Sequence, residues 1–183
     1  MFDVFLDGKK IGYHRFEIDG SESDVAVVSE ASFDVKFLFV TAFSYRHSAR
    51  ENWTGGCLEE IEARTDSNGK ELNVVGERTG DSFVIDTGEQ EARLPGCVMS
   101  FAYWNPRILT ARRLLNGQTG ELLPVNIALR GEETITVRGE PQAARRHRIS
   151  GPGLQIDIWL ADGRWVALEA LVPGGRLLRY ELI

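Results

Sequence analysis

The sequence predicts an all-β fold, an antiparallel and strongly curved sheet that forms a half-open or closed barrel with one short helix. Residues 33–50, FDVKFLFVTAFSYRHSAR, place apolar or aromatic side chains at nearly every odd position. Turn-forming pairs such as Asp7-Gly8, Asn68-Gly69 and Asp162-Gly163 recur along the chain. Short alternating runs between such turns are typical of an antiparallel meander.

The first strands are expected at residues 2–7, 10–19 and 24–32, and residues 33–50 are interpreted as one long strand. Side chains of a strand point to opposite faces with period two, which fits this alternation. At about 3.3 Å per residue the long strand would span roughly 60 Å, so it has to bend. Its odd face is expected to form an apolar wall, made of Phe33, Phe37, Phe39, Phe43 and Tyr45.

Alternation resumes after this strand and continues to the end of the chain. The strands expected there are 57–66, 70–78, 81–86, 122–130, 133–138, 143–150, 154–161, 164–172 and the closing run RLLRYELI. The pairs Gly80-Asp81, Arg130-Gly131 and Gly174-Gly175 are expected to form turns between them.

Residues 98–120 break the alternation and predict the helix. Ile108, Ala111, Leu114 and Leu115 follow a helical spacing. Pro106 suits the first turn of a helix and Asn105 suits its N-cap, which places a short helix near 106–115. Such a helix would plug one mouth of the curved sheet; the alternative is an irregular surface crossover.

Composition narrows the class of protein. A chain of 183 residues without low-complexity segments favours a single domain. A net charge of −6 argues against nucleic-acid binding, and the basic group at residues 145–148 is interpreted as the solvated edge of a strand. The sequence contains no run of eighteen apolar residues that would predict a transmembrane helix. Its first residues do not resemble a secretory signal, so any such signal lies outside this sequence.

Two cysteines leave the cellular compartment open. Cys57 and Cys97 have no further Cys or His at metal-ligand spacing. A disulfide between them would close a loop of about forty residues and fit a periplasmic or exported protein. The alternative is two buried thiols in a cytoplasmic protein.

Four segments resemble an uncharacterised bacterial family, domain of unknown function 6134, which is related to the 3108 group. They are FDVFLDGKKIGYHRF, FSYRHSARENWTGGCLEEIEARTD, PGCVMSFAYWNPRIL and LQIDIWLADGRWVALEALVPGGRLLRYEL. The resemblance covers nearly the whole chain. It implies an exported envelope protein with a fold similar to the lipoprotein carriers LolA and LolB, and it implies neither an activity nor catalytic residues.

Catalytic and metal-binding motifs are missing from the sequence. His14, His47 and His147 are far apart and form no HExxH or HxxxH pattern, and no GxSxG, GxGxxG or Walker-type loop is present. We therefore assign no catalytic residue, no metal site and no cofactor.

A ligand-binding interior is the preferred functional hypothesis. Tyr103, Trp104 and Arg107 cluster after Cys97, and aromatic walls with a few polar groups are typical of small-molecule pockets. We expect them, together with Phe37, Phe39, Phe43 and Tyr45, to bind a lipid, an acyl chain or another hydrophobic molecule without catalysis. Two alternatives remain open. One is an enzyme using Tyr103, His47 and Arg107 as acid–base groups, and the other is a structural or protein-interaction module with a filled core.

Overall fold

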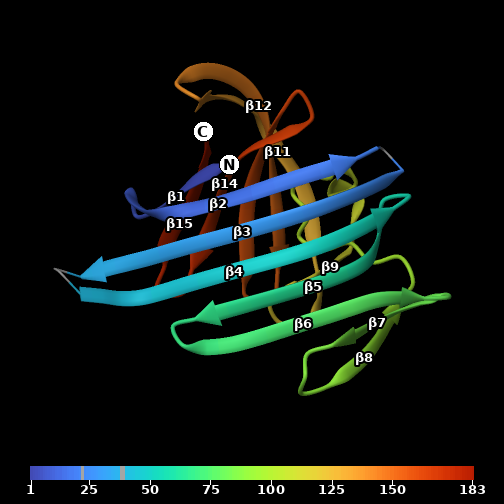
Figure 1. Ribbon diagram of the computed structural model, residues 1–183. Helices are drawn as coiled ribbons and strands as arrows, with labels where there is room; N and C mark the ends of the chain where they lie inside the picture. The colour runs from blue at the N-terminus through green and yellow to red at the C-terminus, as the bar shows by residue number, and fades with distance from the viewer. Residues whose placement is uncertain (22, 38–39) are drawn as a thin grey trace. The chain divides into compact units, whose positions relative to one another are not determined.

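The structure is a computed structural model that describes residues 1–21, 23–37 and 40–183 (Figure 1). Its main sheet contains thirteen strands in the order β11-β12-β13-β14-β15-β1-β2-β3-β4-β5-β6-β7-β8, and β10 pairs with β9 in a second, two-stranded sheet. The successive pairings from β11 to β15, between β15 and β1, and from β3 to β8 are antiparallel. The strand order is open, with β11 and β8 at its edges. The prediction of an all-β, antiparallel fold is confirmed.

The chain divides into two compact units. Unit 1 contains Met1–Tyr13, Ala102–Arg112 and Pro124–Ile183, and unit 2 contains His14–Phe101 and Arg113–Leu123. Strand β2 (Lys9–Gly20) runs across the boundary between these ranges.

Unit 1 is a meander of long strands with one short helix. Its elements are β1 (Phe2–Leu6), η1 (Pro106–Thr110), β11 (Asn126–Val137), β12 (Glu140–Gly151), β13 (Leu154–Ala161), β14 (Arg164–Val172) and β15 (Arg176–Leu182). The register lines up Ile158, Leu168, Tyr180 and Val4 in one row across neighbouring strands. All four are buried, so this row belongs to the apolar face of the unit.

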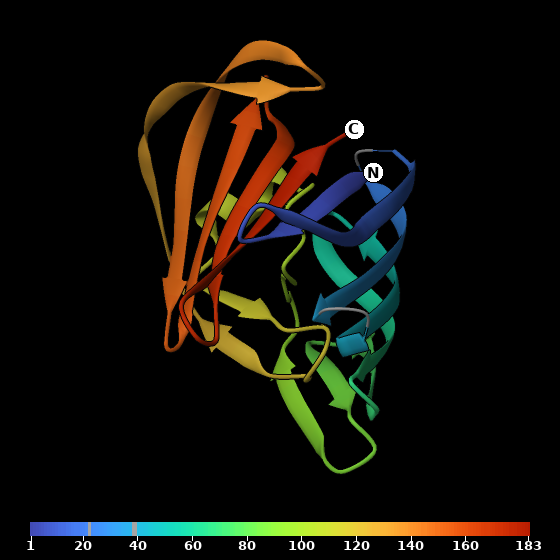
Figure 2. The ribbon, with the colours of Figure 1, turned by 90° about the vertical axis from the view of Figure 1, so that its left-hand side faces the viewer.

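The opposite face of unit 1 carries charged side chains, because successive residues of a strand point to opposite sides. Arg148, Asp157, Glu169 and Arg179 form a row on four consecutive strands of this face. The hairpin β11–β12 bends strongly towards its turn (Figure 2). Its residues Val137 and Ala144 belong to a buried apolar cluster that also contains Trp159, Ala161, Val166 and Ala167.

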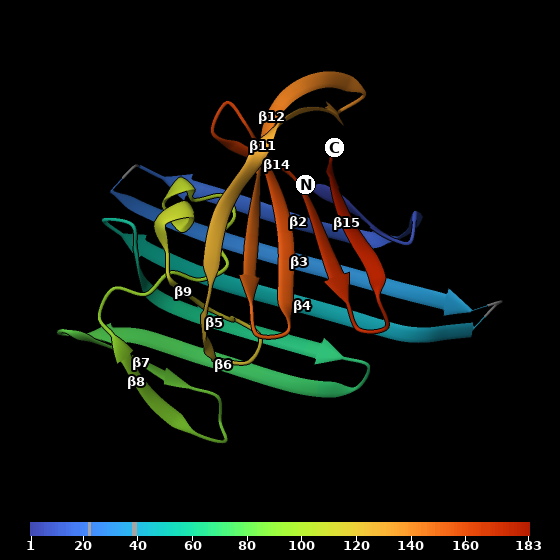
Figure 3. The same ribbon diagram turned by 180° about the vertical axis from the view of Figure 1, so that it is seen from behind.

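Unit 2 contains β3 (Asp24–Phe37), β4 (Val40–Thr54), β5 (Cys57–Ser67), β6 (Lys70–Thr79), β7 (Ser82–Asp86), β8 (Glu91–Pro95) and β9 (Arg113–Leu115), and β10 (Leu122–Pro124) begins in it (Figure 3). Phe83, Ile61 and Ile85 are almost fully buried in its core. Gly76 lies beneath Phe83, where an added Cβ would approach the ring to 2.5 Å. The absence of a side chain at Gly76 therefore allows the Phe83 ring to pack against β6.

The interpretation of residues 33–50 as one strand is wrong. Strand β3 ends at Phe37, β4 begins at Val40, and the two pair with Phe33 opposite Tyr45 and Val35 opposite Phe43. From Val25 opposite Trp53 to Val35 opposite Phe43, odd residues lie opposite odd residues and share one face; the register then shifts, so that Lys36 lies opposite Thr41. Because the odd residues share one face over most of both strands, their alternation resembles that of a single long strand.

The helix and one turn also differ from the prediction. Helix η1 is a 3-10 turn that begins after Asn105 and stops at Thr110, because Ala111 is extended with ψ of 143°. Residues 113–115 form strand β9 instead of the end of a helix. The Arg130-Gly131 pair is a bulge inside β11, since the register with β12 shifts between Leu129 and Gly131.

Candidate functional site

An aromatic row follows the inner positions of β3 and β4 in unit 2. The rings of Phe33 and Tyr45 are stacked at 5.1 Å between centroids, and the imidazole of His47 follows at 6.3 Å from Tyr45. Burial raises the pKa of the Tyr45 hydroxyl. Phe43 lies at the next inner position of β4 and is 38% exposed. The exposure of the aromatic side chains therefore increases along β4 from Tyr45 to Phe43.

The positions of two predicted wall residues, Phe37 and Phe39, cannot be compared with this row. Phe37 closes strand β3, but its side chain is outside the described residues, and Phe39 is outside them altogether. Their part in an apolar wall remains a prediction.

Two half-buried imidazoles give the same face of unit 2 a polar component. The Nδ1 atom of His47 is 2.8 Å from the hydroxyl of Thr65, which lies opposite it on β5. The ring of His14 stacks on Phe16 at 4.1 Å. Burial lowers the pKa of His47 to about 4. Burial also lowers the pKa of His14, to about 3, and the charge of His47 is a second, smaller cause. Both imidazoles are therefore neutral at neutral pH.

Strand β4 also carries a half-buried carboxylate, Glu51, which no sequence motif indicated. Glu51 accepts hydrogen bonds from the hydroxyl of Ser100 and from the indole of Trp53, each at 3.0 Å. Burial raises the pKa of Glu51, and the two hydrogen bonds act against this shift. Because Ser100 belongs to the segment after β8, the carboxylate ties this segment to the sheet.

A disulfide reinforces the same connection. Cys57 at the start of β5 is bonded to Cys97. Next to it, the backbone N–H of Leu58 donates to the carbonyl of Val98 at 3.0 Å, and Leu115 donates to Met99 at 2.8 Å. Residues 97–100 are therefore held in unit 2 by a covalent bond, backbone hydrogen bonds and the Glu51 carboxylate.

The other half of the predicted binding site belongs to unit 1. Tyr103 packs against Trp165 with ring centroids 5.1 Å apart, and burial raises the pKa of its hydroxyl. Trp104 is half-buried and Arg107 is exposed. The side chain of Asn105 accepts a hydrogen bond from the backbone N–H of Arg107 and caps η1, as its position in the sequence predicted. A common site formed with Phe43 and Tyr45 remains a prediction, as does an acid–base group of Tyr103, Arg107 and His47.

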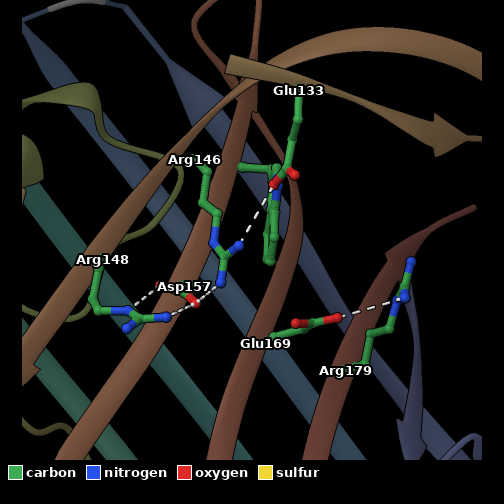
Figure 4. A network of polar contacts seen from close by, with 7 residues as sticks. Glu133, Arg146, Arg148, Asp157, Glu169 and Arg179 are labelled. Carbon is green, nitrogen blue, oxygen red and sulfur yellow. Dashed lines mark hydrogen bonds and ion pairs between the residues drawn. The ribbon is translucent and has the colours of Figure 1, made fainter. Parts of the chain in front are cut away.

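The charged face of unit 1 contains a network that the sequence analysis did not predict. Arg148 binds Asp157 through two hydrogen bonds of 2.7 Å, and Arg146 binds it through one of 2.5 Å (Figure 4). The side chain of Asp157 is only 7% exposed. Desolvation alone would raise the pKa of Asp157, but hydrogen bonds from Arg148 and then Arg146 outweigh it and lower the pKa below its usual value.

This network corrects the interpretation of residues 145–148 as a solvated strand edge. Strand β12 lies between β11 and β13, and Arg146 and Arg148 are both engaged with Asp157. Arg145 points to the other side and does form an exposed pair with Glu132 at 3.7 Å. A single acid within the apolar run LQIDIWLA was the available sign of a buried ion pair.

Trp159 extends the network along β13. Its indole N–H donates to Glu133 at 2.6 Å, and the guanidinium of Arg146 lies over its ring, 5.2 Å from the centroid. A pocket of about 240 Å³ lies here, lined by Glu133, Ile135, Arg146, Trp159, Ala167, Leu168, Glu169 and Arg179. The pocket thus combines an aromatic surface with two acidic and two basic side chains.

A second pocket of unit 1 lies beside η1. It measures about 370 Å³ and is lined partly by Pro106, Leu109, Arg145 and His147. Burial lowers the pKa of His147. In the described part of the chain, no group of three or more His, Cys, Asp or Glu side chains is arranged to hold a metal ion. No helix within the described residues is long and apolar enough to cross a membrane.

These features define an all-β protein with an antiparallel sheet, an aromatic row and a charged network. Residues 2–183 match the family described as domain of unknown function 6134, DUF6134, and the chain belongs to this family. The fold is similar to the crystal structure of a β-barrel-like protein of DUF1849 from Brucella abortus, with a TM-score of 0.73 and 10% sequence identity over 100% of this chain and 93% of that chain. No curated protein matches the sequence.

Proposed function

We propose that this protein binds a hydrophobic or amphipathic ligand, such as a lipid or an acyl chain, without catalysis. The main support is the aromatic row of unit 2, in which buried Phe33 and half-buried Tyr45 lead to Phe43 at 38% exposure. An acyl chain laid on such a row would gain about 0.8 kcal/mol for each CH₂ group removed from water.

We also propose that the protein works in the bacterial envelope. The disulfide between Cys57 and Cys97 supports this location, because disulfides persist in oxidising compartments and are rare in the cytoplasm. The resemblance to exported envelope proteins noted from the sequence points the same way.

The decisive experiment is native mass spectrometry on protein purified from its own cells without detergent. We expect extra mass on the folded chain that disappears after extraction with organic solvent, and the extract then identifies the ligand. A bare chain, with no apolar molecule taken up on incubation with extracted lipids, would contradict the proposed function.

Replacement of Phe43 by aspartate is expected to weaken binding of a dansyl-labelled fatty acid about 10- to 100-fold. The change removes an apolar contact worth about 1.5–3 kcal/mol and places a charge beside the ligand. Fluorescence titration measures the affinity. The matched control is Val75→Asp on β6, because Val75 is 53% exposed and adjacent to buried Val74 on the other face of the strand. Equal affinities of folded Phe43→Asp and Val75→Asp proteins would remove the row from the binding site.

The envelope location predicts that Cys57 and Cys97 are oxidised in the protein taken from cells. We expect thiol alkylation under denaturing conditions to label neither cysteine before reduction and both after reduction, with the protein in the envelope fraction. Intact-mass measurement counts the labels. Two labels before reduction, on protein from a cytoplasmic fraction that was alkylated at lysis, would argue for the cytoplasmic alternative.

A further inference from the structure

The pocket on the charged face of unit 1 differs in chemistry from the aromatic row. Its walls carry Glu133 and Arg146 from one hairpin and Glu169 and Arg179 from strands β14 and β15. Between them lie the ring of Trp159 and the small side chain of Ala167, which are cross-strand partners. Two acids and two bases around an aromatic surface fit an occupant that carries both signs of charge.

The ion pairs that line the pocket are longer than the Arg148–Asp157 pair next to it. Arg148 contacts Asp157 at 2.7 Å, which is hydrogen-bond distance. By contrast, Arg146 lies 3.8 Å from Glu133, and Arg179 lies 3.5 Å from Glu169. A charged ligand can insert more easily into a long pair than into a hydrogen-bonded one, because it displaces less favourable contacts.

The register concentrates negative charge at the centre of this face. Asp157 and Glu169 are direct cross-strand partners, and like charges in such positions repel. Asp157 is balanced by Arg146 and Arg148, whereas Glu169 has its long contact to Arg179, a guanidinium that also pairs with Glu181 at 3.0 Å. Glu169 is therefore well placed to accept an ammonium group, and Arg179 lies next to it to bind an acidic group.

Size limits the occupant. A pocket of about 240 Å³ is smaller than most drug-sized ligand sites. Trp159 adds a π-face, which attracts cations. The Arg146 guanidinium already lies over this ring, and the indole N–H is held by Glu133, so the aromatic surface has a fixed orientation.

We propose that this pocket binds a small zwitterion, in which an ammonium group and a carboxylate or phosphate lie a few atoms apart. The ammonium binds Glu169 and the acidic group binds Arg179, while Trp159 and Ala167 contact the carbon atoms between them. Such a ligand comes either from a free amino acid or from the headgroup of an ethanolamine phospholipid. This site goes beyond the proposed binding of an apolar molecule by unit 2 and does not depend on it.

The test follows the indole N–H resonance of Trp159 in the ¹⁵N-labelled full chain. Trp159→Phe assigns this signal among the four tryptophans. The probes are L-serine, phosphoethanolamine, ethanolamine and inorganic phosphate. We expect at least one of the two zwitterions to shift the signal with an affinity tenfold or more above that of ethanolamine and phosphate. Preference for serine indicates a free amino acid, and preference for phosphoethanolamine indicates a headgroup.

Variants test the two contacts separately. Glu169→Gln and Arg179→Gln are each expected to lower the affinity for the bound zwitterion at least tenfold. The matched controls are Glu62→Gln and Arg64→Gln, which alter an exposed pair of 3.4 Å in unit 2 and are expected to leave the affinity unchanged. The amide spectrum shows whether each variant is folded.

Three results would overturn the proposal. The first is that none of the four probes shifts the Trp159 signal. The second is that ethanolamine or phosphate, each of which carries charge of one sign only, binds as tightly as the zwitterions. The third is that the folded Glu169→Gln and Arg179→Gln proteins bind like their controls. Because the aromatic row is assayed with a fatty acid, failure here is distinguishable from failure of the proposed function.

Discussion

Acidification from pH 7 to pH 4 is expected to remove several kcal/mol of folding stability through His14 and His47, the two half-buried histidines of unit 2. The pKa is about 4 for His47 and about 3 for His14, whereas an imidazole in the unfolded chain titrates near 6.5. Between these values the unfolded state binds more protons than the folded state, so the free energy of unfolding falls as the pH falls. The stability is fully present above pH 6.5 and is lost as the pH drops towards 4.

His47 alone is expected to contribute about 3 kcal/mol over this range, because each unit of pKa shift corresponds to about 1.4 kcal/mol. His14 acts in the same direction. Burial is the larger cause of its low pKa, and the charge of His47 lowers it further. Glu51 opposes the trend, since its raised pKa contributes stability that is present at low pH and lost as the pH rises through that pKa. One carboxyl group does not offset two imidazoles.

Urea unfolding at several pH values between 7 and 4.5 measures this dependence. The double variant His14→Asn, His47→Asn should lose most of the slope, whatever its stability at pH 7. His147→Asn is the control, because His147 is less buried and belongs to unit 1. A double variant that loses stability as steeply as the natural protein would show that other groups cause the acid sensitivity.

Turn chemistry made the strand boundaries predictable. Asp7, Asn68 and Asp162 adopt positive φ, and each is followed by a glycine with positive φ. These conformations are what Asp-Gly and Asn-Gly pairs favour, so their hairpins could be placed from the sequence. Leu38-Phe39 carries no such residue type, and for this reason the boundary between β3 and β4 was not predicted.

Site features that depend on the alternation within a strand could be predicted from the sequence, whereas features that depend on the register between strands could not. The stacked pair Phe33 and Tyr45 follows from alternation, because odd residues lie opposite odd residues in this part of the β3–β4 pairing. The network around Asp157 depends on register. Arg148 faces Asp157 because β12 and β13 pair in one particular alignment, and a shift of one residue would move the acid to the apolar face.

Replacement of Asp157 by alanine is expected to cost about 2–3 kcal/mol of folding stability. Removing one partner of a buried ion pair typically costs about 3–5 kcal/mol, because it leaves charge without compensation. The side chains of Arg146 and Arg148 are 32% and 28% exposed, so water recovers part of this cost. Denaturant unfolding measures the change. The control is Glu30→Ala, which breaks an exposed pair with Arg15 and is expected to cost less than about 1 kcal/mol.

A triple variant distinguishes the net contribution of the ion pairs to folding stability from the destabilisation caused by removing only one partner. Replacing Arg146 and Arg148 with methionine and Asp157 with leucine removes all three charges of the triad together. Glu133 then loses its 3.8 Å contact with Arg146, but its side chain is 45% exposed and is hydrated. Because desolvation offsets much of the attraction within a buried triad, this protein is expected to be more stable than Asp157→Ala and close to the natural one. If the triple variant is instead the least stable of the three, the ion pairs themselves stabilise unit 1. If Asp157→Ala unfolds like Glu30→Ala, the arginines are already hydrated and the network contributes little to the fold.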